Sequence, residues 1–393
     1  VVALLGMLNA VEAGSQSALM APTEILARQH MATIEPLAAA AGVTAVLLTG
    51  REKGKAREAV LAGMASGETA LAIGTHALFQ EDVAFHDLAF AVVDEQHRFG
   101  VHQRLMLAEK GEGADVLVMT ATPIPRTLTL AAFGDLDVSR LTEKPLGRKP
   151  VETRALPLSS LGKVIERVAA KCASGERVYW VCPLIEESEV LDVAAASERF
   201  ESLKKIIGDR VGLVHGAMKG KDKDAVMAQF VCGEITVLVA TTVIEVGVDV
   251  PQATVMVIEH AERFGLAQLH QLRGRIGRGG EASVCILLYA QPLGVTAKAR
   301  IDIMRQTDDG FRIAEEDLRL RGAGEVLGTR QSGLPEMRLA DLAVDGELLA
   351  IARDDARLVL EKNPGLEGER GKALRVLLYL FERDSVVKYA RSG

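Results

Sequence analysis

The sequence contains few cysteine residues, and none of them form a pattern that is typical of a metal or disulfide site. The four cysteines are scattered along 393 residues without a C-x-x-C pair: Cys172, Cys182, Cys232 and Cys285. Zinc sites and disulfide frameworks depend on closely and regularly spaced cysteines. Neither is therefore indicated, and a reducing cytosol is the expected compartment.

The chain also lacks a long apolar run and an excess of positive charge. No uninterrupted apolar stretch reaches the length needed to span a bilayer. The formal net charge of −7 argues against a protein that binds nucleic acid through a globally basic surface. It leaves open a protein that contacts a phosphate backbone through a few local donors. No internal repeat or low-complexity segment stands out.

The sequence does contain a regular alternation of short apolar runs and helix-patterned stretches. The first apolar runs lie at residues 17–20, 45–48, 70–73, 88–93 and 116–119. Helical patterns, such as those at residues 24–41 and 53–65, separate them. A segment with two prolines and a glycine interrupts the alternation at residues 143–150. Further apolar runs follow at residues 178–181, 211–214, 237–240, 255–258 and 285–288.

This alternation is typical of parallel β-α-β units. We therefore expect an α/β fold with two tandem domains, at residues 1–145 and 146–292, each with a parallel sheet covered by helices. After residue 292 strand signals are few, so residues 293–393 are expected to form a mainly helical extension.

Two carboxylates, Asp94 and Glu95, directly follow the apolar run at residues 88–93. Such a run predicts a buried parallel strand, and open α/β sheets bind ligands at the carboxyl ends of their strands. Asp followed by Glu in this place is how many nucleotide hydrolases hold Mg²⁺ and orient the attacking water. The alternative is a strand that ends in a solvated acidic turn, since four-residue matches are common.

A glycine-rich segment with several arginines occupies residues 271–279, late in the second expected domain. Arg275 and Arg278 are three residues apart, so at a helix end they would project from one face. Two guanidinium groups in a cleft suit the charge that builds on a transferring γ-phosphoryl group. The alternative is a solvated arginine patch.

Hydroxyl groups and glycines follow other apolar runs. Thr120 and Thr122 could hydrogen-bond the segment after residue 93 and report its state across the sheet, although threonines also initiate ordinary turns. A helix that begins near Thr242 would offer backbone N–H groups to phosphate, and Gly247 and Asp249 could then approach a nucleotide. The alternative role of Asp249 is that of a turn residue ahead of a proline.

The segments at residues 20–29 and 73–78 each join a strand end to a helix start. Both place hydroxyl and backbone donors at strand carboxyl ends, which suits phosphate contacts that position a nucleic acid without specifying its sequence. Simple helix capping by Thr23 or Thr75 is the alternative for each.

Together and in this order, these segments resemble the superfamily 2 helicases, motors in which two RecA-like domains bind ATP between them. The resemblance is closest to the RecG family, and it rests on residues 94–100, 120–127, 180–188, 211–216, 266–279 and 328–333. Mfd-type transcription-repair coupling translocases share the motor and the region after it. Gln96 and residues 185–188 favour RecG over Mfd.

The resemblance implies an ATP- and Mg²⁺-dependent DNA helicase of the bacterial cytoplasm, associated with the nucleoid, that translocates on duplex DNA and remodels stalled forks and Holliday junctions. It further implies a monomeric motor, with branched or duplex DNA and single-stranded DNA-binding protein as partners. Asp94 would bind nucleotide and hold Mg²⁺ through water, and Glu95 would deprotonate the attacking water. Gln271, Arg275 and Arg278 would complete the catalytic site, and Gly247 and Asp249 would contact the nucleotide.

The remaining implied roles concern DNA. The residues expected to touch nucleic acid are Pro22, Thr23, Arg28, Gly74, Thr75, His76, Thr241 and Thr242. Those expected to couple ATP turnover to movement are Gln96, His97, Thr120, Thr122, Arg300, Arg330 and Gln331. For the last three of these, surface charges that cap helices are the alternative.

The sequence departs from the family in two respects. The phosphate-cradling loop, G-x-x-x-x-G-K-[ST], would be expected immediately before Val1 and does not occur in these residues, and neither does the family's wedge domain. We therefore expect this polypeptide by itself to hydrolyse ATP poorly or not at all. The alternative functions are those of an Mfd-type transcription-repair coupling translocase and of an inert nucleic-acid-binding fragment.

Overall fold

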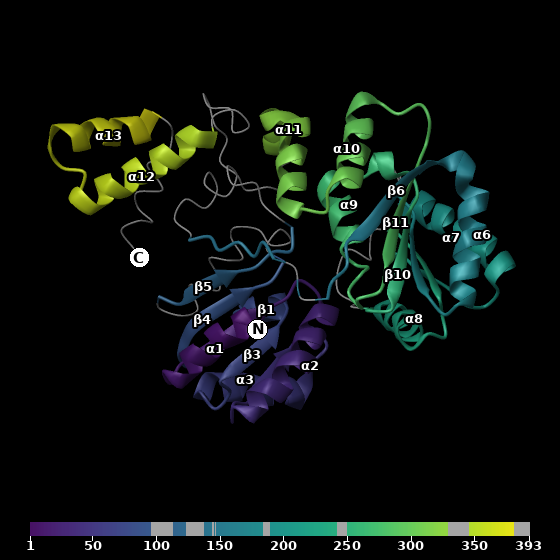
Figure 1. Cartoon of the computed structure of the whole chain (residues 1–393). Helices are drawn as coiled ribbons and strands as arrows, with labels where there is room; N and C mark the ends of the chain where they lie inside the picture. The colour runs from purple at the N-terminus through teal and green to yellow at the C-terminus, as the bar shows by residue number, and fades with distance from the viewer. Residues whose placement is uncertain are drawn as a thin grey trace.

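The computed structural model describes residues 1–95, 113–122, 137–143, 145, 147–183, 189–241, 250–328 and 346–380. These residues form two parallel β-sheets with helices packed on them, followed by further helices (Figure 1). The predicted α/β fold class with a helical C-terminal extension is confirmed. No helix in the described part of the chain is long and apolar enough to cross a membrane.

The first sheet has five parallel strands in the order β2-β3-β1-β4-β5. The strands are β1 (Gln16–Met20), β2 (Ala45–Leu48), β3 (Leu71–Gly74), β4 (Leu88–Val93) and β5 (Asp115–Val118). Each bound lies within one residue of the apolar run predicted for it, because strands covered on both faces are mostly apolar.

Helices cover both faces of this sheet. Helices α1 (Val2–Glu12) and α2 (Glu24–Ala40) bury Met7 and Ile34 against the face that carries Leu19 and Ile73. On the opposite face, α3 (Gly54–Ser66) and the short helix η1 (His76–Phe79) pack on alternate residues of the same strands, such as Met20. The two-residue period of a strand thus divides its side chains between two cores.

Gly74 ends β3 at a point where a side chain would collide with the neighbouring strand. A Cβ atom at Gly74 would lie 2.2 Å from the carbonyl oxygen of Leu48 and 2.9 Å from the side chain of Leu78. Since the nearest obstacle is backbone, it cannot rotate away. We expect Gly74→Ala to lower the free energy of unfolding by about 1–3 kcal/mol, as overpacking of a core does.

Urea unfolding of the Gly74→Ala variant checks this prediction. Gly162→Ala is the matched control, because a Cβ atom at Gly162 would meet no heavy atom within 4 Å. The control should unfold at the same or a slightly higher urea concentration than the parent. A Gly74→Ala midpoint equal to that of the control would contradict the steric argument.

The second sheet has six parallel strands in the order β6-β11-β10-β7-β9-β8. The strands are β6 (Val151–Pro157), β7 (Arg177–Val181), β8 (Val211–Val214), β9 (Val237–Ala240), β10 (Ala253–Ile258) and β11 (Ser283–Tyr289). Five of them match predicted apolar runs to within two residues at either end. The edge strand β6 was not predicted, because Glu152 and Arg154 alternate with its half-buried residues and pair with each other in solvent.

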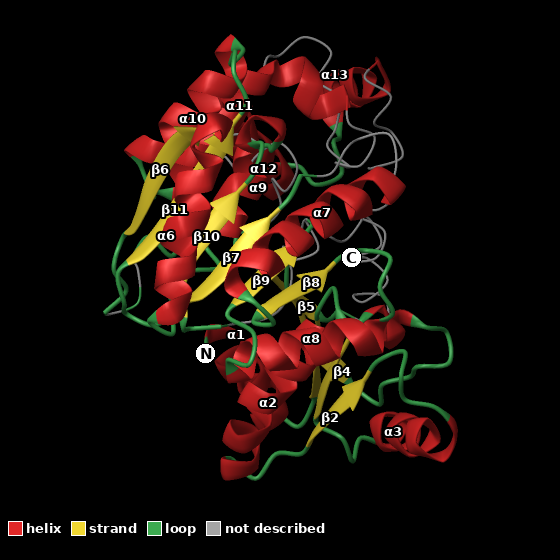
Figure 2. Ribbon diagram, turned by 90° about the vertical axis from the view of Figure 1, so that its right-hand side faces the viewer, coloured by secondary structure: helices red, strands yellow, loops and turns green. Residues whose placement is uncertain are grey.

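Helices α6 (Leu161–Ala173) and α7 (Glu189–Ile207) cover one face of this sheet, around the buried Trp180. Helices α8 (Gly220–Cys232) and α9 (Leu266–Arg273) cover the other face, where Phe230 packs on Tyr179. Figures 1 and 2 both place α8 on the side of the second sheet that faces the first domain.

The C-terminal extension contains α10 (Val295–Gln306), α11 (Gly310–Gly328), α12 (Gly346–Lys362) and α13 (Gly368–Leu380). Helices α10 and α11 contact each other and α9, so this pair rests on the second domain. All strands of the first sheet fall within residues 16–118 and those of the second within 151–289. The domain bounds 1–145, 146–292 and 293–393 remain predictions.

Candidate nucleotide and nucleic-acid site

Asp94 and Glu95 lie at the carboxyl end of β4, beside the end of β1. The main-chain N–H of Asp94 donates to the carbonyl of Met20 at 2.9 Å. In the strand order, connections from β1 lead to one side of the sheet and those from β4 to the other, so this is the topological switch point where such sheets bind ligands. The predicted position of the two carboxylates is therefore the one where a nucleotide site is expected.

The Asp94 carboxylate is held by two hydrogen bonds. Its Oδ1 accepts the main-chain N–H of Glu95 at 2.9 Å, and its Oδ2 lies 2.7 Å from Nε2 of His30 on α2. Glu95 has a φ of +52°, a left-handed conformation that is uncommon for a residue with a side chain. His30 was not predicted from the sequence, where the only available signal was its place two turns after Thr23 on the helix that follows β1.

A chain of hydrogen bonds leads from Glu95 to the second domain. The Glu95 carboxylate accepts the main-chain N–H of Ala121 at 3.5 Å, at the weak limit, and the N–H of Thr122 donates to Thr120 Oγ1 at 3.1 Å. The side-chain amide of Gln271 donates to the Thr122 hydroxyl across the domain boundary. The structure thus brings together Glu95, Thr120, Thr122 and Gln271.

Arg275 and Arg278 lie beyond the end of α9, so the expectation that they project from one helix face is wrong. The helix ends at Arg273, and Gly277 adopts a φ of +75°, which turns the chain out of the helical path. The Arg278 Nε donates to the carbonyl of Gly274 at 3.2 Å. A Cβ atom at Gly279 would lie 2.4 Å from the carbonyl oxygen of Pro251, so this glycine serves close packing on the protein's own backbone.

Arg273, in the same segment, is a structural residue that the sequence analysis did not single out. It is 3 % exposed, and burial lowers the pKa of its guanidinium. Its Nη1 donates to the carbonyls of Met304 at 2.7 Å and Thr307 at 3.0 Å, at the end of α10, where helix carbonyls lack intrahelical partners. Arg273 therefore joins the arginine segment to the C-terminal helices.

The residues predicted to touch nucleic acid occupy different environments. Thr23 caps α2 by accepting the N–H of Leu26 at 3.3 Å, which matches the capping alternative, while Arg28 and His76 are exposed and Pro22 is half-buried. Gly74, Thr75 and Thr241 are buried. The Thr75 hydroxyl has no hydrogen-bond partner among the described residues. All of these assignments remain predictions.

Seven of the predicted residues lie outside the described part of the chain: Gln96, His97, Thr242, Gly247, Asp249, Arg330 and Gln331. Arg300 lies on α10, half-buried, and its Nε is buried without a partner in the described part of the chain.

Two tandem parallel sheets, with acids at the carboxyl edge of the first and an arginine segment in the second, define the two RecA-like domains of a superfamily 2 helicase motor. The family comparisons agree. Residues 1–130 match the DEAD/DEAH box helicase model, residues 159–280 the helicase conserved C-terminal domain, and residues 307–379 the C-terminal part of domain 3 of ATP-dependent DNA helicase RecG.

The similar proteins identify the family within this class. The chain is 52% identical over 379 residues to ATP-dependent DNA helicase RecG of Escherichia coli (strain K12), covering 95% of this chain and 54% of that protein. It is 48% identical over 357 residues to RecG of Bacillus subtilis (strain 168), covering 90% and 52%. A solved structure of RecG bound to a three-way DNA junction superposes with a TM-score of 0.70 and 43% identity, covering 88% of this chain and 45% of that one.

The chain belongs to the RecG family of ATP-dependent DNA helicases. It spans about half the length of the curated relatives it matches.

The helicase class implies Mg²⁺, and the residues present fit a hydrated ion. Mg²⁺ is commonly bound through one or two carboxylates, several waters and the phosphates of a nucleotide. Each Asp94 oxygen takes part in one hydrogen bond, so each retains a lone pair for water around a cation. In the described part of the chain no group of three or more His, Cys, Asp or Glu could enclose a metal. Asp94 is thus the residue that would hold the ion.

His30 is predicted to position Asp94 for this task. Groups that orient a metal ligand typically contribute about 10–100-fold to metal affinity or activity. We expect His30→Ala to raise the Mg²⁺ concentration for half-maximal ATP hydrolysis by about 10-fold, in a protein where this chain follows a G-x-x-x-x-G-K-[ST] loop (hereafter the loop-bearing protein).

Titration of ATPase activity with Mg²⁺ checks the role of His30, and DNA binding without nucleotide should stay unchanged. Gln29→Ala, at the adjacent position of α2, is the control. If His30→Ala and Gln29→Ala show the same Mg²⁺ dependence, His30 does not position the carboxylate.

Proposed function

We propose that this chain is the motor of an ATP-dependent translocase that moves on double-stranded DNA and thereby remodels branched DNA such as stalled forks and Holliday junctions. The observation that carries the proposal is the contact between Thr122 and Gln271. It joins the segment after β5, which hydrogen-bonds Glu95, to α9, the helix that precedes the arginine segment. The similarity to RecG proteins, one of them solved on a three-way DNA junction, supports the choice of substrate.

In the proposed mechanism, ATP binds between the two domains. When bound, Mg²⁺ neutralises charge on the phosphate oxygens. Asp94 would hold the hydrated ion. Glu95 orients a water molecule and accepts its proton as the water attacks the γ-phosphorus, while the bond from that phosphorus to the bridging oxygen breaks and ADP leaves. Arg275 and Arg278 stabilise the negative charge that builds on the transferring group, with Gln271 sensing closure through Thr122. Gly247 and Asp249 contact the nucleotide from the second domain.

Closure of the cleft is proposed to move DNA. The coupling residues transmit the nucleotide state to the residues that face DNA. The coupling residues in the motor are Thr120, Thr122, Gln96 and His97. The residues that face DNA are Pro22, Thr23, Arg28, Gly74, Thr75, His76, Thr241 and Thr242. Arg273 supports a second route, because it ties the arginine segment to the end of α10. The domain movement is then transmitted to the duplex by Arg300 of that helix and by Arg330 and Gln331.

Displacement of a triplex-forming strand from a DNA duplex tests translocation by the loop-bearing protein. We expect displacement that needs ATP and Mg²⁺, together with ATPase activity that rises when a three-way junction is added. The 393-residue polypeptide alone should bind junction DNA but hydrolyse ATP poorly. Absence of DNA binding by the polypeptide at low salt would overturn the proposal, and nucleic-acid binding without displacement by the loop-bearing protein would favour an inert binding fragment.

The proposed setting follows from the relatives. We expect the protein to work as a monomer in the bacterial cytoplasm, at the nucleoid, with branched DNA and single-stranded DNA-binding protein as partners. The match of residues 307–379 to the C-terminal part of RecG domain 3 supports this function over that of an Mfd-type transcription-repair coupling translocase.

A further inference from the structure

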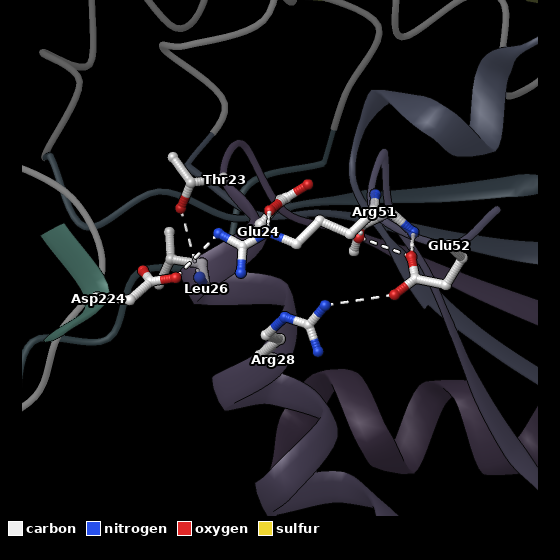
Figure 3. Close-up of polar contacts among 8 residues, drawn as sticks. Thr23, Glu24, Leu26, Arg28, Arg51, Glu52 and Asp224 are labelled. Carbon is white, nitrogen blue, oxygen red and sulfur yellow. Dashed lines mark hydrogen bonds and ion pairs between the residues drawn. The ribbon is translucent and has the colours of Figure 1, made fainter. Parts of the chain in front are cut away.

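One ion pair joins the two domains on the side that carries Thr23 and Arg28. Arg51, in the loop after β2, donates from Nη2 to Oδ2 of Asp224 on α8 at 2.9 Å. Its Nε also lies 2.5 Å from Oε2 of Glu24 on α2, within its own domain (Figure 3). We refer to the Arg51–Asp224 pair as the latch, because it connects residues 173 positions apart in different domains.

The latch belongs to a cluster that contains proposed phosphate contacts. Arg28 pairs with Glu52 at 3.3 Å, and Glu52 is fixed by hydrogen bonds from the main chain and hydroxyl of Thr49 at 2.5 and 2.6 Å. Thr23 immediately precedes Glu24, the second partner of Arg51 (Figure 3). Any phosphate that reached Thr23 or Arg28 would therefore come close to Arg51.

The charges in this cluster are paired internally. Two guanidinium groups, those of Arg28 and Arg51, face three carboxylates, those of Glu24, Glu52 and Asp224. The hydrogen bond to Asp224 is the largest factor that raises the pKa of Arg51, ahead of the opposing effect of burial and of the attraction of Glu24. In the free protein, carboxylates thus occupy the positions around each arginine that phosphate oxygens would take.

The two partners of Arg51 connect it to different domains. Glu24 fixes the guanidinium to its own domain and would keep it in place if Asp224 withdrew. Asp224 fixes it to the other domain, and both side chains of the latch reach solvent, with exposed fractions of 43% and 37%. An ion pair this exposed changes an equilibrium by only about twofold to fivefold, so a phosphate could replace it.

We propose that a DNA phosphate and Asp224 compete for Arg51, so that the latch holds the two domains together in the free protein and opens when DNA binds. This inference rests on the proposed function, since it takes the DNA backbone as the competing anion. Arg51 then binds a DNA phosphate only after its ion pair with Asp224 has broken. Opening of the latch releases α8, and with it the second domain, from the first domain.

Asp222 offers a matched control for Asp224. It lies two residues earlier on α8 and is exposed, and it forms no ion pair with any residue that the structure describes. Two residues correspond to about 200° around a helix, so the two carboxylates point in nearly opposite directions. Asp222→Asn and Asp224→Asn remove the same charge from the same helix, and only the second removes the latch.

The first measurement is the distance between the domains in the absence of DNA. Energy transfer can be recorded between dyes on Cys232, the exposed native cysteine at the end of α8, and on a cysteine introduced as Glu58→Cys on α3. The other three cysteines are buried, and burial raises the pKa of their thiols, so they react slowly. Asp224→Asn and Arg51→Ala should both change the transfer efficiency, whereas Asp222→Asn should not.

The second measurement is binding of a blunt linear duplex at low salt without nucleotide. Relative to Asp222→Asn, Asp224→Asn should tighten binding by about twofold to fivefold, because the competitor for Arg51 is gone. Arg51→Ala should weaken binding and reduce the slope of log affinity against log salt by about 1. A merely structural contact would move both variants in the same direction, so the opposite signs identify the competition.

Combining the substitutions completes the test. In an Arg51→Ala background, Asp224→Asn should affect duplex binding no more than Asp222→Asn does. Equal behaviour of Asp224→Asn and Asp222→Asn in both assays would overturn the latch, and an unchanged salt slope in Arg51→Ala would overturn the phosphate contact. If the parent chain bound no duplex, the proposed function would fail, while the energy-transfer result would still decide whether the pair holds the domains.

Discussion

Glu95→Gln in the loop-bearing protein is expected to abolish ATP turnover and to leave ATP binding intact. A glutamine has nearly the same shape, but it cannot accept the proton that the attacking water must lose. General bases contribute about 10²–10⁴-fold to rate, so the ATPase rate should fall by about that factor. The surroundings of Glu95 should persist, because its main-chain N–H bond to Asp94 does not involve the side chain.

Steady-state hydrolysis and equilibrium binding of a fluorescent ATP analogue together check this expectation. Glu58→Gln, which neutralises an exposed carboxylate on α3, is the control and should hydrolyse ATP like the parent. Loss of both binding and turnover in Glu95→Gln would indicate a role in nucleotide affinity instead. Turnover at the parental rate would mean that the base has been assigned to the wrong residue.

The strands were predictable because the sheets are parallel and covered on both faces. Residues 88–93 had to be apolar throughout, and the chain could then offer polar groups only where the strand ended, at Asp94. The same logic failed at β6, an edge strand with one face in solvent, where Glu152 and Arg154 interrupt the apolar pattern. The exposed charged residues of β6, and not its edge position, explain the failure, since the other edge strands β2, β5 and β8 match predicted apolar runs.

The site was predictable where its chemistry lies in one segment and unpredictable where it depends on tertiary contacts. His30 meets Asp94 only because α2 packs beside the end of β4, 64 residues away in sequence. Arg273 finds its carbonyl partners at the end of a helix that follows a whole strand later. The helical arrangement assigned to Arg275 and Arg278 failed for a local reason, since spacing alone does not reveal that α9 ends at Arg273.

The second domain contains a buried ionic network of similar tertiary origin. Glu259 follows β10 and is 6 % exposed, and its Oε1 accepts hydrogen bonds from Trp180 Nε1 and Arg199 Nε, each at 2.5 Å. A second Arg199 nitrogen donates to Oε2 at 3.1 Å. Burial lowers the pKa of Arg199, but the bonds and charge of Glu259 outweigh this effect and raise it. Three side-chain donors, one from Trp180 and two from Arg199, therefore hydrogen-bond the buried Glu259 carboxylate.

Arg199→Met is expected to lower the free energy of unfolding by about 3–5 kcal/mol, because it leaves the Glu259 carboxylate buried without its counter-ion. Adding Glu259→Leu should restore most of this loss, since an apolar pair avoids the cost of an unpaired buried charge. Urea unfolding followed by fluorescence reports on the network directly, because Trp180 is the only tryptophan of the chain and is itself bonded to Glu259. Arg154→Met, which breaks the exposed pair with Glu152, is the control and should leave the midpoint unchanged. If the Arg199 variant matched that control, the network would be polar packing with no ionic contribution to stability.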